Sequence, residues 1–381
     1  MNFEFSEEQT ALRDTLLRYL QKNYGFEQRR EIIRSTDGWS RAHWKQFAEM
    51  GLTAIGLPEA YGGYGLGGPF DTYVVMEAFG RALVVEPYLA SVVLAADLIA
   101  HVGSGAQKSA LLPKVASGEL QLALAHQEPG ARYELAHVAT KSVASGNGYV
   151  LDGAKTVVLN GAAADRLIVS ARTAGGERDE AGISLFLVDP KSSGVSIHGY
   201  PTQDGQRAAD ITLKGVQVSA DALLGQAGAA LPAIEHQLQH AIAALCAEAV
   251  GAMGALLEIT GAYLKTRKQF GVPIGSFQAL QHRMADMLMQ LESARSMAYL
   301  IAARIGSADL QERRRAVAAA KALVGQAARH VGQQAVQLHG GIGVTDELNV
   351  SHYFKRLTMI DLTFGDAAHH LARYSDLMLA A

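Results

Sequence analysis

Two short stretches in the last third of the sequence combine residue types that can hold a ligand. The first, "QLHGGIGVTDE", covers residues 337–347 and interrupts a region that otherwise has a helical pattern. Gly340, Gly341 and Gly343 carry no side chain, so backbone amides there can face a bound molecule. The side-chain amide of Gln337 can both donate and accept hydrogen bonds. We therefore expect this segment to contact a ligand.

The second stretch, "RKQFGVPIGSFQ", starts at Arg267 and joins two predicted helices. Gly271 is expected to stop the first helix, and Pro273 prevents its continuation. Arg267, Phe270 and Gln278 then lie on a loop that is able to bind a phosphate and an aromatic ring. An Arg near a helix end is also common in ordinary helix hairpins, so the residues of this stretch alone leave both interpretations open.

Two other patterns have simpler explanations. Residues 63–68, "GYGLGG", match the phosphate-binding pattern G-x-G-x-x-G, but Pro58 breaks the preceding run and the surroundings are helical, which favours a surface loop. His236 and His240 share a helix face, yet no Glu lies between them and no third ligand is apparent. We interpret them as solvated side chains and expect no metal site.

The composition is that of an ordinary globular protein. The 381 residues exceed the roughly 250 to 300 at which one core stops growing, so two or three domains are expected. Hydrophobic residues make up 49% and charged residues 19%, which is enough apolar material for a sizeable core. A net charge of -3 gives no basic field, so nucleic acid is not an expected partner.

The chain start and the single cysteine bear on the compartment. "MNFEFSEEQT" lacks both the basic and the apolar region of an export signal, so we expect a cytoplasmic protein. Cys246 is the one cysteine, which excludes a disulfide framework and a Cys-based metal cage. Acidic residues cut the longest apolar runs before they reach the ~20 residues that span a bilayer, so no membrane segment is expected.

The hydrophobic patterns divide the chain into three parts and predict a multi-domain α+β fold. Residues 1–120 have helical spacing, with helices predicted at 7–20, 41–50, 71–80, 88–101 and 107–116. Residues 121–226 contain six short β-branched runs without helices between them, which indicates an antiparallel sandwich or barrel. Residues 227–381 contain three long helical segments, and we expect a fourth helix after Asn349, as in a helix bundle.

Taken together, these motifs resemble those of the acyl-CoA dehydrogenases. R-x-Q-F-G-x-P-I-x-x-F-Q is followed by Q-x-H-G-G-x-G, and "GLTAIGLPEAYGGYGLG" and "YVLDGAKTVVLNGAAADRLIVSAR" also look like segments of the family in the family's order. The resemblance covers essentially the whole chain. It implies an N-terminal helical domain, a middle β-barrel and a C-terminal four-helix bundle. Among the family's branches, the sequence looks most like the small subunit of a pimeloyl-CoA dehydrogenase.

The resemblance also implies FAD as cofactor, an acyl-CoA substrate and an electron-transfer flavoprotein as electron acceptor. It implies that Arg267, Phe270, Gln278 and the segment of Gln337, His339, Gly340 and Gly341 reach across a subunit interface to the ADP half of FAD. The expected reaction is α,β-desaturation of an acyl thioester: a carboxylate removes the α proton while hydride leaves the β carbon.

The catalytic base is where the sequence departs from the family. The family's Y-E-G-T motif corresponds to "TFGD", which places Phe364 where the Glu is expected. Ala241 occupies the alternative position that some relatives give to the Glu. Glu248, seven residues further along that helix, and Asp366 are the nearby candidates. A buried Glu248 that is paired with an Arg is an equally good interpretation.

The segments that should face the flavin ring are altered as well. Gln127 stands where the family has a Thr, Arg132 and Tyr133 replace a Gly and a Ser, and Val157 and Leu159 replace the Trp and Thr of W-I-T. Three hypotheses follow. The chain is a complete dehydrogenase in a homodimer or homotetramer, or a half-site partner in a heterotetramer with a related subunit, or an acyl-CoA-binding relic without catalysis.

Overall fold

The computed structural model describes residues 5–64 and 68–380. The chain forms two compact units. One unit comprises Met1–Glu31, Gly68–Val84 and Ile242–Ala381, and the other comprises Ile32–Gly67 and Val85–Ala241. Each unit is therefore built from segments that are far apart in the sequence.

The first part of the chain is helical, as its periodicity predicts. Its helices are α1 (Glu7–Asn23), α2 (Phe26–Arg34), α3 (Arg41–Glu49), α4 (Pro69–Ala82), a π-helical segment (Leu89–Ala96), α5 (Asp97–Val102) and α6 (Gly105–Ala116). Ser6 caps α1: its hydroxyl accepts from the amide of Gln9, and the Gln9 side chain accepts from the amide of Ser6. Such a reciprocal pair satisfies two amide groups that have no partner inside the helix. Ser104 and Gln107 do the same for α6.

The middle part is a sheet of eight strands. They are β1 (Leu122–Ala125), β2 (Lys141–Ser145), β3 (Gly148–Leu159), β4 (Arg166–Arg172), β5 (Ile183–Val188), β6 (Val195–Pro201), β7 (Arg207–Ser219) and β8 (Leu223–Leu224). The order is β6-β7-β3-β2-β4-β5-β8, and β1 pairs with β4. Most neighbours are antiparallel, as expected, but β1 and β2 both pair with β4 in parallel. The predicted antiparallel architecture is confirmed, and the parallel pairs at β4 are features that the sequence patterns did not indicate.

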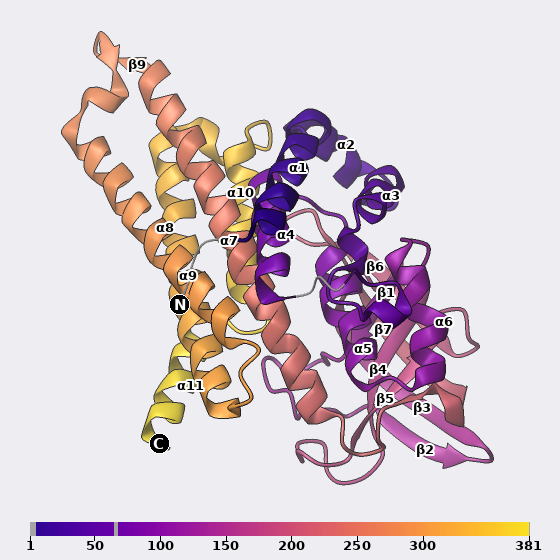
Figure 1. Ribbon diagram of the computed structural model, residues 1–381. Helices are drawn as coiled ribbons and strands as arrows, with labels where there is room; N and C mark the ends of the chain where they lie inside the picture. Colours follow the sequence, from indigo (N-terminus) through magenta and orange to yellow (C-terminus); the bar gives the residue numbers. More distant parts are fainter. Residues whose placement is uncertain (1–4, 65–67, 381) are drawn as a thin grey trace. The chain divides into compact units, whose positions relative to one another are not determined.

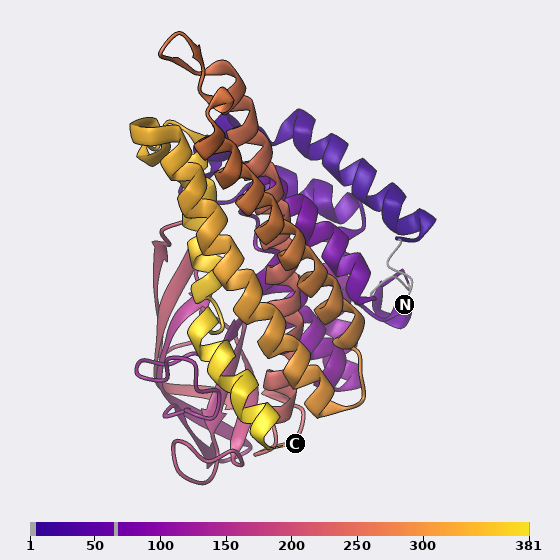
Figure 2. The ribbon, with the colours of Figure 1, turned by 90° about the vertical axis from the view of Figure 1, so that its left-hand side faces the viewer.

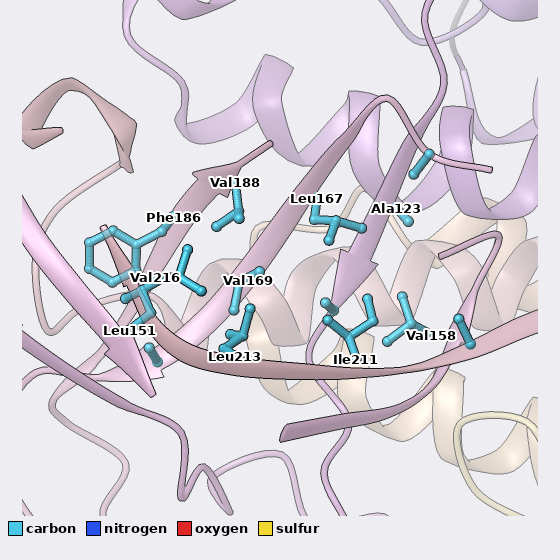
Figure 3. Packing of buried hydrophobic residues seen from close by; sticks show 14 residues of the cluster. Ala123, Leu151, Val158, Leu167, Val169, Phe186, Val188, Ile211, Leu213 and Val216 are labelled. Atoms are coloured by element: carbon cyan, nitrogen blue, oxygen red, sulfur yellow. The ribbon is translucent and has the colours of Figure 1, made fainter. Parts of the chain in front are cut away.

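The core of this sheet comes from inward-facing side chains of five strands. Figure 3 shows Leu151 and Val158 of β3 close to Ile211 and Leu213 of β7, with residues of β1, β4 and β5 beside them. Alternate residues along a strand point to opposite faces, so each of these strands gives one apolar row to this core. The burial of that row fixes the register of the strands.

The last part of the chain forms long helices that run side by side in both views (Figures 1 and 2). They are α7 (Leu231–Thr266), α8 (Gln278–Arg304), α9 (Leu310–His339), α10 (Asn349–Leu362) and α11 (Ala367–Leu379). The helix expected after Asn349 is thus two helices, and α8, α10 and α11 all pack on α9. α7 is apolar and long enough to cross a membrane, but 78% of its most apolar window is buried inside the protein, as is typical of a core helix.

Candidate functional site

A β-hairpin, not a simple helix stop, joins α7 to α8. α7 ends at Thr266, and β9 (Lys268–Gln269) then pairs with β10 (Val272–Pro273). The two turn residues, Phe270 and Gly271, have φ angles of 54° and 83°. Two successive residues with positive φ make the tight turn that matches the twist of a two-residue hairpin. Gly271 therefore serves this turn, and the prediction that it terminates α7 was wrong.

This hairpin carries three of the residues predicted to bind a cofactor. Figure 1 shows it projecting beyond the ends of α7 and α8, near the label β9. Arg267 and Gln278 are exposed, and the Phe270 ring is 91% exposed. A phenyl ring that is so fully exposed loses the stabilisation that apolar burial gives, which makes it a candidate contact for another molecule.

The glycine segment lies at the same end of the bundle. α9 ends at His339, and Gln337, Gly340 and Gly341 are exposed. The guanidinium of Arg283, in the second turn of α8, donates to the side chain of Gln334 near the end of α9 at 2.7 Å. A side chain built on Gly340 or Gly341 would meet no atom within 4 Å, so the backbone there is open.

His339 differs from the other predicted contacts because its ring is buried. It stacks on Tyr263 with 4.3 Å between ring centroids, and Nδ1 donates to the carbonyl of Ala335 at 2.8 Å. Burial lowers the pKa of this imidazole. The ring joins the ends of α7 and α9, and a direct contact between His339 and a cofactor stays a prediction.

The exposed residues at this end fit the ADP half of FAD chemically. The guanidinium of Arg267 can make charge-assisted hydrogen bonds to a diphosphate. The face of Phe270 can stack on a purine. The amide of Gly340 donates to carbonyls of α9, so this segment offers a ligand exposed backbone at Gly341. These groups are exposed, so a ligand held by them is accessible to a second molecule.

The segments predicted to face the flavin ring lie together in the other unit. The backbone amide of Thr156 donates to the carbonyl of Gln127 at 2.9 Å. The β3–β7 register shifts between Lys155 and Val158, and Val157 has a φ of 51°, rare for a β-branched residue. One carboxylate oxygen of Asp210 holds this bulge: it accepts from the Thr156 hydroxyl at 2.7 Å and the Val157 amide at 3.2 Å.

A buried ion pair joins the same two segments, because Glu128 follows Gln127 and Lys155 precedes Thr156. Lys155 Nζ donates to Glu128 Oε1 at 2.6 Å and to the hydroxyl of Ser170 at 2.9 Å. Glu128 also accepts from the amides of Ala139 and Thr140. Burial raises the pKa of Glu128, but Lys155 and these hydrogen bonds outweigh it and the net pKa is lowered. The framework is thus rigid, while the ring-facing positions differ from the family: Gln127 and Val157 are both exposed.

Phe364, which the sequence prediction aligns with the family's base, lies in the turn between α10 and α11. Its φ is 59°, and the following Gly365 has a φ of 110°. The ring is half-buried. A phenyl group cannot accept a proton, so position 364 supplies no base.

Glu248 is engaged in a buried ion pair with Arg356 of α10. Arg356 Nε donates to Glu248 Oε1 and Nη2 donates to Oε2, both at 2.6 Å. The side chains are only 7% and 4% exposed for Arg356 and Glu248. The alternative left open by the sequence, a buried Glu paired with an Arg, is therefore the arrangement observed. With both carboxylate oxygens engaged, the assignment of Glu248 as a base loses support and stays an untested prediction.

Asp366 has a structural function at the start of α11. Its carboxylate accepts from the amide of His369 at 2.8 Å, which is the geometry of an N-cap. Its assignment as a base also stays untested. Ala241, at the family's alternative base position, is buried and apolar, as is its neighbour Ile242.

Sequence reasoning missed two residues: Arg356, which binds Glu248, and Lys321, which binds the turn that contains Phe364. Arg356 is 108 residues from Glu248 along the chain, and no periodicity links them. Lys321 had a visible signal, because it is a lysine within the Ala-rich run "AVAAAKALVGQAA" of α9 and is fully buried. A charged residue on an apolar helix face indicates a buried polar contact.

The other two motifs do not form sites in the described part of the chain. Residues 65–67 of the G-x-G-x-x-G match lie outside the described residues, and the residues before it form a short 3-10 helix (Glu59–Tyr61), not a strand. His236 is half-buried and stacks between His101 and His240, so the interpretation as freely solvated side chains was wrong. Within residues 5–64 and 68–380, no cluster of three or more His, Cys, Asp or Glu residues is placed to hold a metal ion.

Three family models match successive parts of the chain. The acyl-CoA dehydrogenase N-terminal domain matches residues 6–119, the middle domain residues 123–216 and the C-terminal domain residues 231–375. A probable acyl-CoA dehydrogenase, YngJ of Bacillus subtilis, is 31% identical over 374 residues, which is 96% of each chain.

Solved structures agree with these matches. Butyryl-CoA dehydrogenase of Megasphaera elsdenii superposes with a TM-score of 0.91 at 25% identity over 100% of both chains. A chain of the ChsE4-ChsE5 complex of Mycobacterium tuberculosis superposes with a TM-score of 0.90 at 26% identity, again over 100% of both chains. The chain belongs to the acyl-CoA dehydrogenase family, whose members are FAD-binding flavoproteins.

Proposed function

We propose that this protein is a subunit of an FAD-dependent acyl-CoA dehydrogenase and that it supplies the ADP half of a flavin site to a related subunit, which carries the base. The complete enzyme desaturates an acyl-CoA thioester between its α and β carbons. FAD, when bound, accepts the hydride that leaves the β carbon. An electron-transfer flavoprotein is the proposed acceptor of the electrons.

One observation carries the proposal: both oxygens of the best base candidate already bind a guanidinium. A carboxylate that abstracts a proton needs a free lone pair directed at that proton. Both carboxylate oxygens of Glu248 accept hydrogen bonds from Arg356, at 2.6 Å each. Asp366 caps α11, and position 364 holds a phenylalanine. This arrangement favours removal of the α proton by a group from another chain.

The contrast between the two halves of the flavin site supports the same proposal. The hairpin with Arg267 and Phe270 and the segment with Gly340 match the family's motifs toward ADP. The ring-facing positions Gln127 and Val157 do not. A chain that lends ADP contacts to a neighbour needs the first set and not the second.

A heteromeric assembly has a counterpart among similar structures. The ChsE4-ChsE5 structure is, by its description, a complex of two proteins. We propose a heterotetramer in which each copy of this chain faces a related subunit.

The FAD contacts are tested by Arg267→Ala, with Lys265→Ala as the matched control. Both residues are exposed basic side chains at the end of α7, but only Arg267 belongs to the hairpin motif. Each variant is co-expressed with any acyl-CoA dehydrogenase-like protein that a neighbouring gene encodes, and FAD per complex is measured after gel filtration. Loss of a charge-assisted phosphate contact of about 1.5 to 3 kcal/mol predicts roughly 10- to 100-fold weaker FAD binding for Arg267→Ala.

Lys265→Ala should retain the FAD content of the parent complex. Equal FAD content and equal FAD affinity in the two variants would remove Arg267 from the flavin site. A parent chain that binds FAD and desaturates acyl-CoA without a partner would favour the alternative, a self-sufficient dehydrogenase with a relocated base.

A further inference from the structure

The turn that carries Phe364 is held by buried side chains from two neighbouring helices. It consists of Thr363, Phe364, Gly365 and Asp366, and it joins α10 to α11. We call these four residues the base turn, because the family's base belongs at its second position. The hydrogen bonds of its backbone determine whether the turn keeps its conformation although position 364 holds no glutamate.

Lys321 of α9 makes the central contact. Its ammonium group donates to the carbonyl of Gly365 at 2.7 Å and to the carbonyl of Asp361, in the last turn of α10, at 2.7 Å. The Lys321 side chain is fully buried. Burial lowers the pKa of this amine to about 8, so it is charged at neutral pH and makes strong hydrogen bonds.

His370 and Asp361 hold the two sides of the base turn. Nε2 of His370 donates to the carbonyl of Phe364 at 2.9 Å. Burial, with the nearby Lys321 cation, lowers the pKa of His370 to about 3, so the ring stays neutral. The carboxylate of Asp361 accepts from the amide of Ala367 at 3.0 Å and from the guanidinium of Arg329 at 2.8 Å. Two consecutive carbonyls of the base turn, 364 and 365, are thus each bound by a buried side chain.

The backbone of Phe364 reveals that this framework, and not the preference of the residue, sets the conformation. A φ of 59° is uncommon for any residue other than Gly, Asn or Asp, and phenylalanine has no side-chain hydrogen bond that favours it. Such a conformation persists only when the surroundings impose it. Gly365 is equally constrained, because a Cβ there would lie 2.5 Å from Nε2 of His370.

We propose that Lys321 is a positioning residue that keeps the base turn in a base-bearing conformation, and that the substitution at position 364 alone removes its basicity. This inference rests on the proposed function and adds one requirement to it, that an acyl thioester also reaches the turn of this chain. It predicts that Phe364→Glu converts the chain from a subunit without a base into one that abstracts an α proton.

The chemistry to be tested is hydrogen exchange, which needs no electron acceptor. The carboxylate introduced at position 364 takes the α proton, and the electron pair of the broken C–H bond moves to the thioester carbonyl. In D2O the carboxylate then returns a deuteron to the α carbon, so one C–H bond is replaced by one C–D bond. Water is the only co-reactant, and no redox change occurs.

The experiment uses the full chain purified with its FAD content recorded. Butyryl-CoA, octanoyl-CoA and palmitoyl-CoA are first compared as ligands by calorimetry, and the ester that binds most tightly is incubated in D2O and analysed by mass spectrometry. General-base catalysis contributes roughly 100- to 10,000-fold, so Phe364→Glu should exchange at least about 100-fold faster than the parent.

The contribution of Lys321 is measured in the Phe364→Glu background. Lys321→Met removes the donors to the turn at similar side-chain length and should lower the saturated exchange rate at least tenfold. The ester concentration that gives half of that rate should change less than twofold, which a general loss of structure would not produce. Lys355→Met is the matched control: it removes a half-buried lysine of α10 that pairs with the exposed Asp346, and it should change neither value twofold. His370→Met replaces Lys321→Met if the latter yields no folded protein.

Each outcome has a definite meaning. Fast exchange in Phe364→Glu that falls with Lys321→Met but not with Lys355→Met supports the inference. An ester that binds without exchange overturns it, and so does exchange that is indifferent to Lys321 and His370. If none of the three esters binds, the inference fails as well, whereas the flavin half-site is judged separately by the FAD content of Arg267→Ala.

Discussion

Glu248→Gln separates a structural carboxylate from a catalytic one. The substitution keeps the size and shape of the side chain but removes the charge that faces Arg356. Both partners are almost fully buried, and the two hydrogen bonds between them are 2.6 Å long. The guanidinium would then remain buried without a counter-charge, which is among the most costly defects that one substitution can create.

The expected cost follows from that burial. Removal of one partner from a buried ion pair costs about 3 to 5 kcal/mol of unfolding free energy. For a chain of this length, with an unfolding entropy of about 2.1 cal/mol/K per residue, the loss corresponds to a fall in Tm of roughly 4 to 6 °C. Replacement of both Glu248 and Arg356 by Met should recover most of the loss, because it removes both buried charges.

The matched control lies on the same helix. Glu258 of α7 pairs with Arg81 at 2.7 Å, but its side chain is 67% exposed. Exposed pairs contribute less than about 1 kcal/mol, so Glu258→Gln should shift Tm by no more than roughly 1 °C. Thermal unfolding is followed by circular dichroism at fixed protein and FAD concentrations, since bound ligand changes Tm.

A different result would refute the reasoning. If Glu248→Gln unfolds within 1 °C of the parent and also abolishes desaturation by the purified chain, the carboxylate is catalytic and its pairing contributes little. A large loss of stability together with an unchanged rate per folded complex would fit a structural ion pair.

Two further predictions concern pH and backbone conformation. Burial lowers the pKa of His126 and His370 to about 3 in the folded state, against 6.5 in the unfolded chain. Between these pH values the unfolded state binds more protons than the folded state. The stability of the protein therefore falls as pH drops below about 6.5. Urea titrations at pH 7 and pH 5 should show this loss of stability, of about 2 kcal/mol for each histidine. His126→Asn should reduce the loss, whereas His198→Asn, at an exposed position, should not. A urea midpoint that does not depend on pH would contradict both assignments. Gly365 has a φ of 110° and lies beside His370, so Gly365→Ala should lower the unfolding free energy by about 1 to 3 kcal/mol. Gly306→Ala adds a Cβ that meets no atom within 4 Å and should change that free energy by less than about 1 kcal/mol. Equal effects of the two substitutions in urea denaturation would contradict the strain argument.

The elements with clear local patterns could be predicted from the sequence. The run "GYVLDGAKTVVL" is β3 from its first residue to its last, because β-branched residues lie between turn residues at both ends. The cap at Ser6 also follows from local residues alone. α2 was missed because its nine residues, "FEQRREIIR", are mostly polar and leave a weak apolar face.

Features that depend on distant partners could not be predicted. Nothing local indicates that β4 pairs in parallel with β1 and β2 or that Phe270 shares a tight turn with Gly271. For the site, the residue types toward ADP were visible in the sequence. The engagement of Glu248 was not, because its partner Arg356 arrives from a helix 108 residues later.

The most direct test of the account is the flavin spectrum of the chain expressed alone and together with a related acyl-CoA dehydrogenase-like subunit, sought among the products of the neighbouring genes. FAD per chain is quantified from the visible absorption, and bleaching is recorded without oxygen after an acyl-CoA ester is added. The account predicts stable FAD binding and bleaching in the complex only. Stoichiometric FAD that is bleached by acyl-CoA in the chain alone would contradict it, because this chain would then carry both halves of the flavin site and its own base.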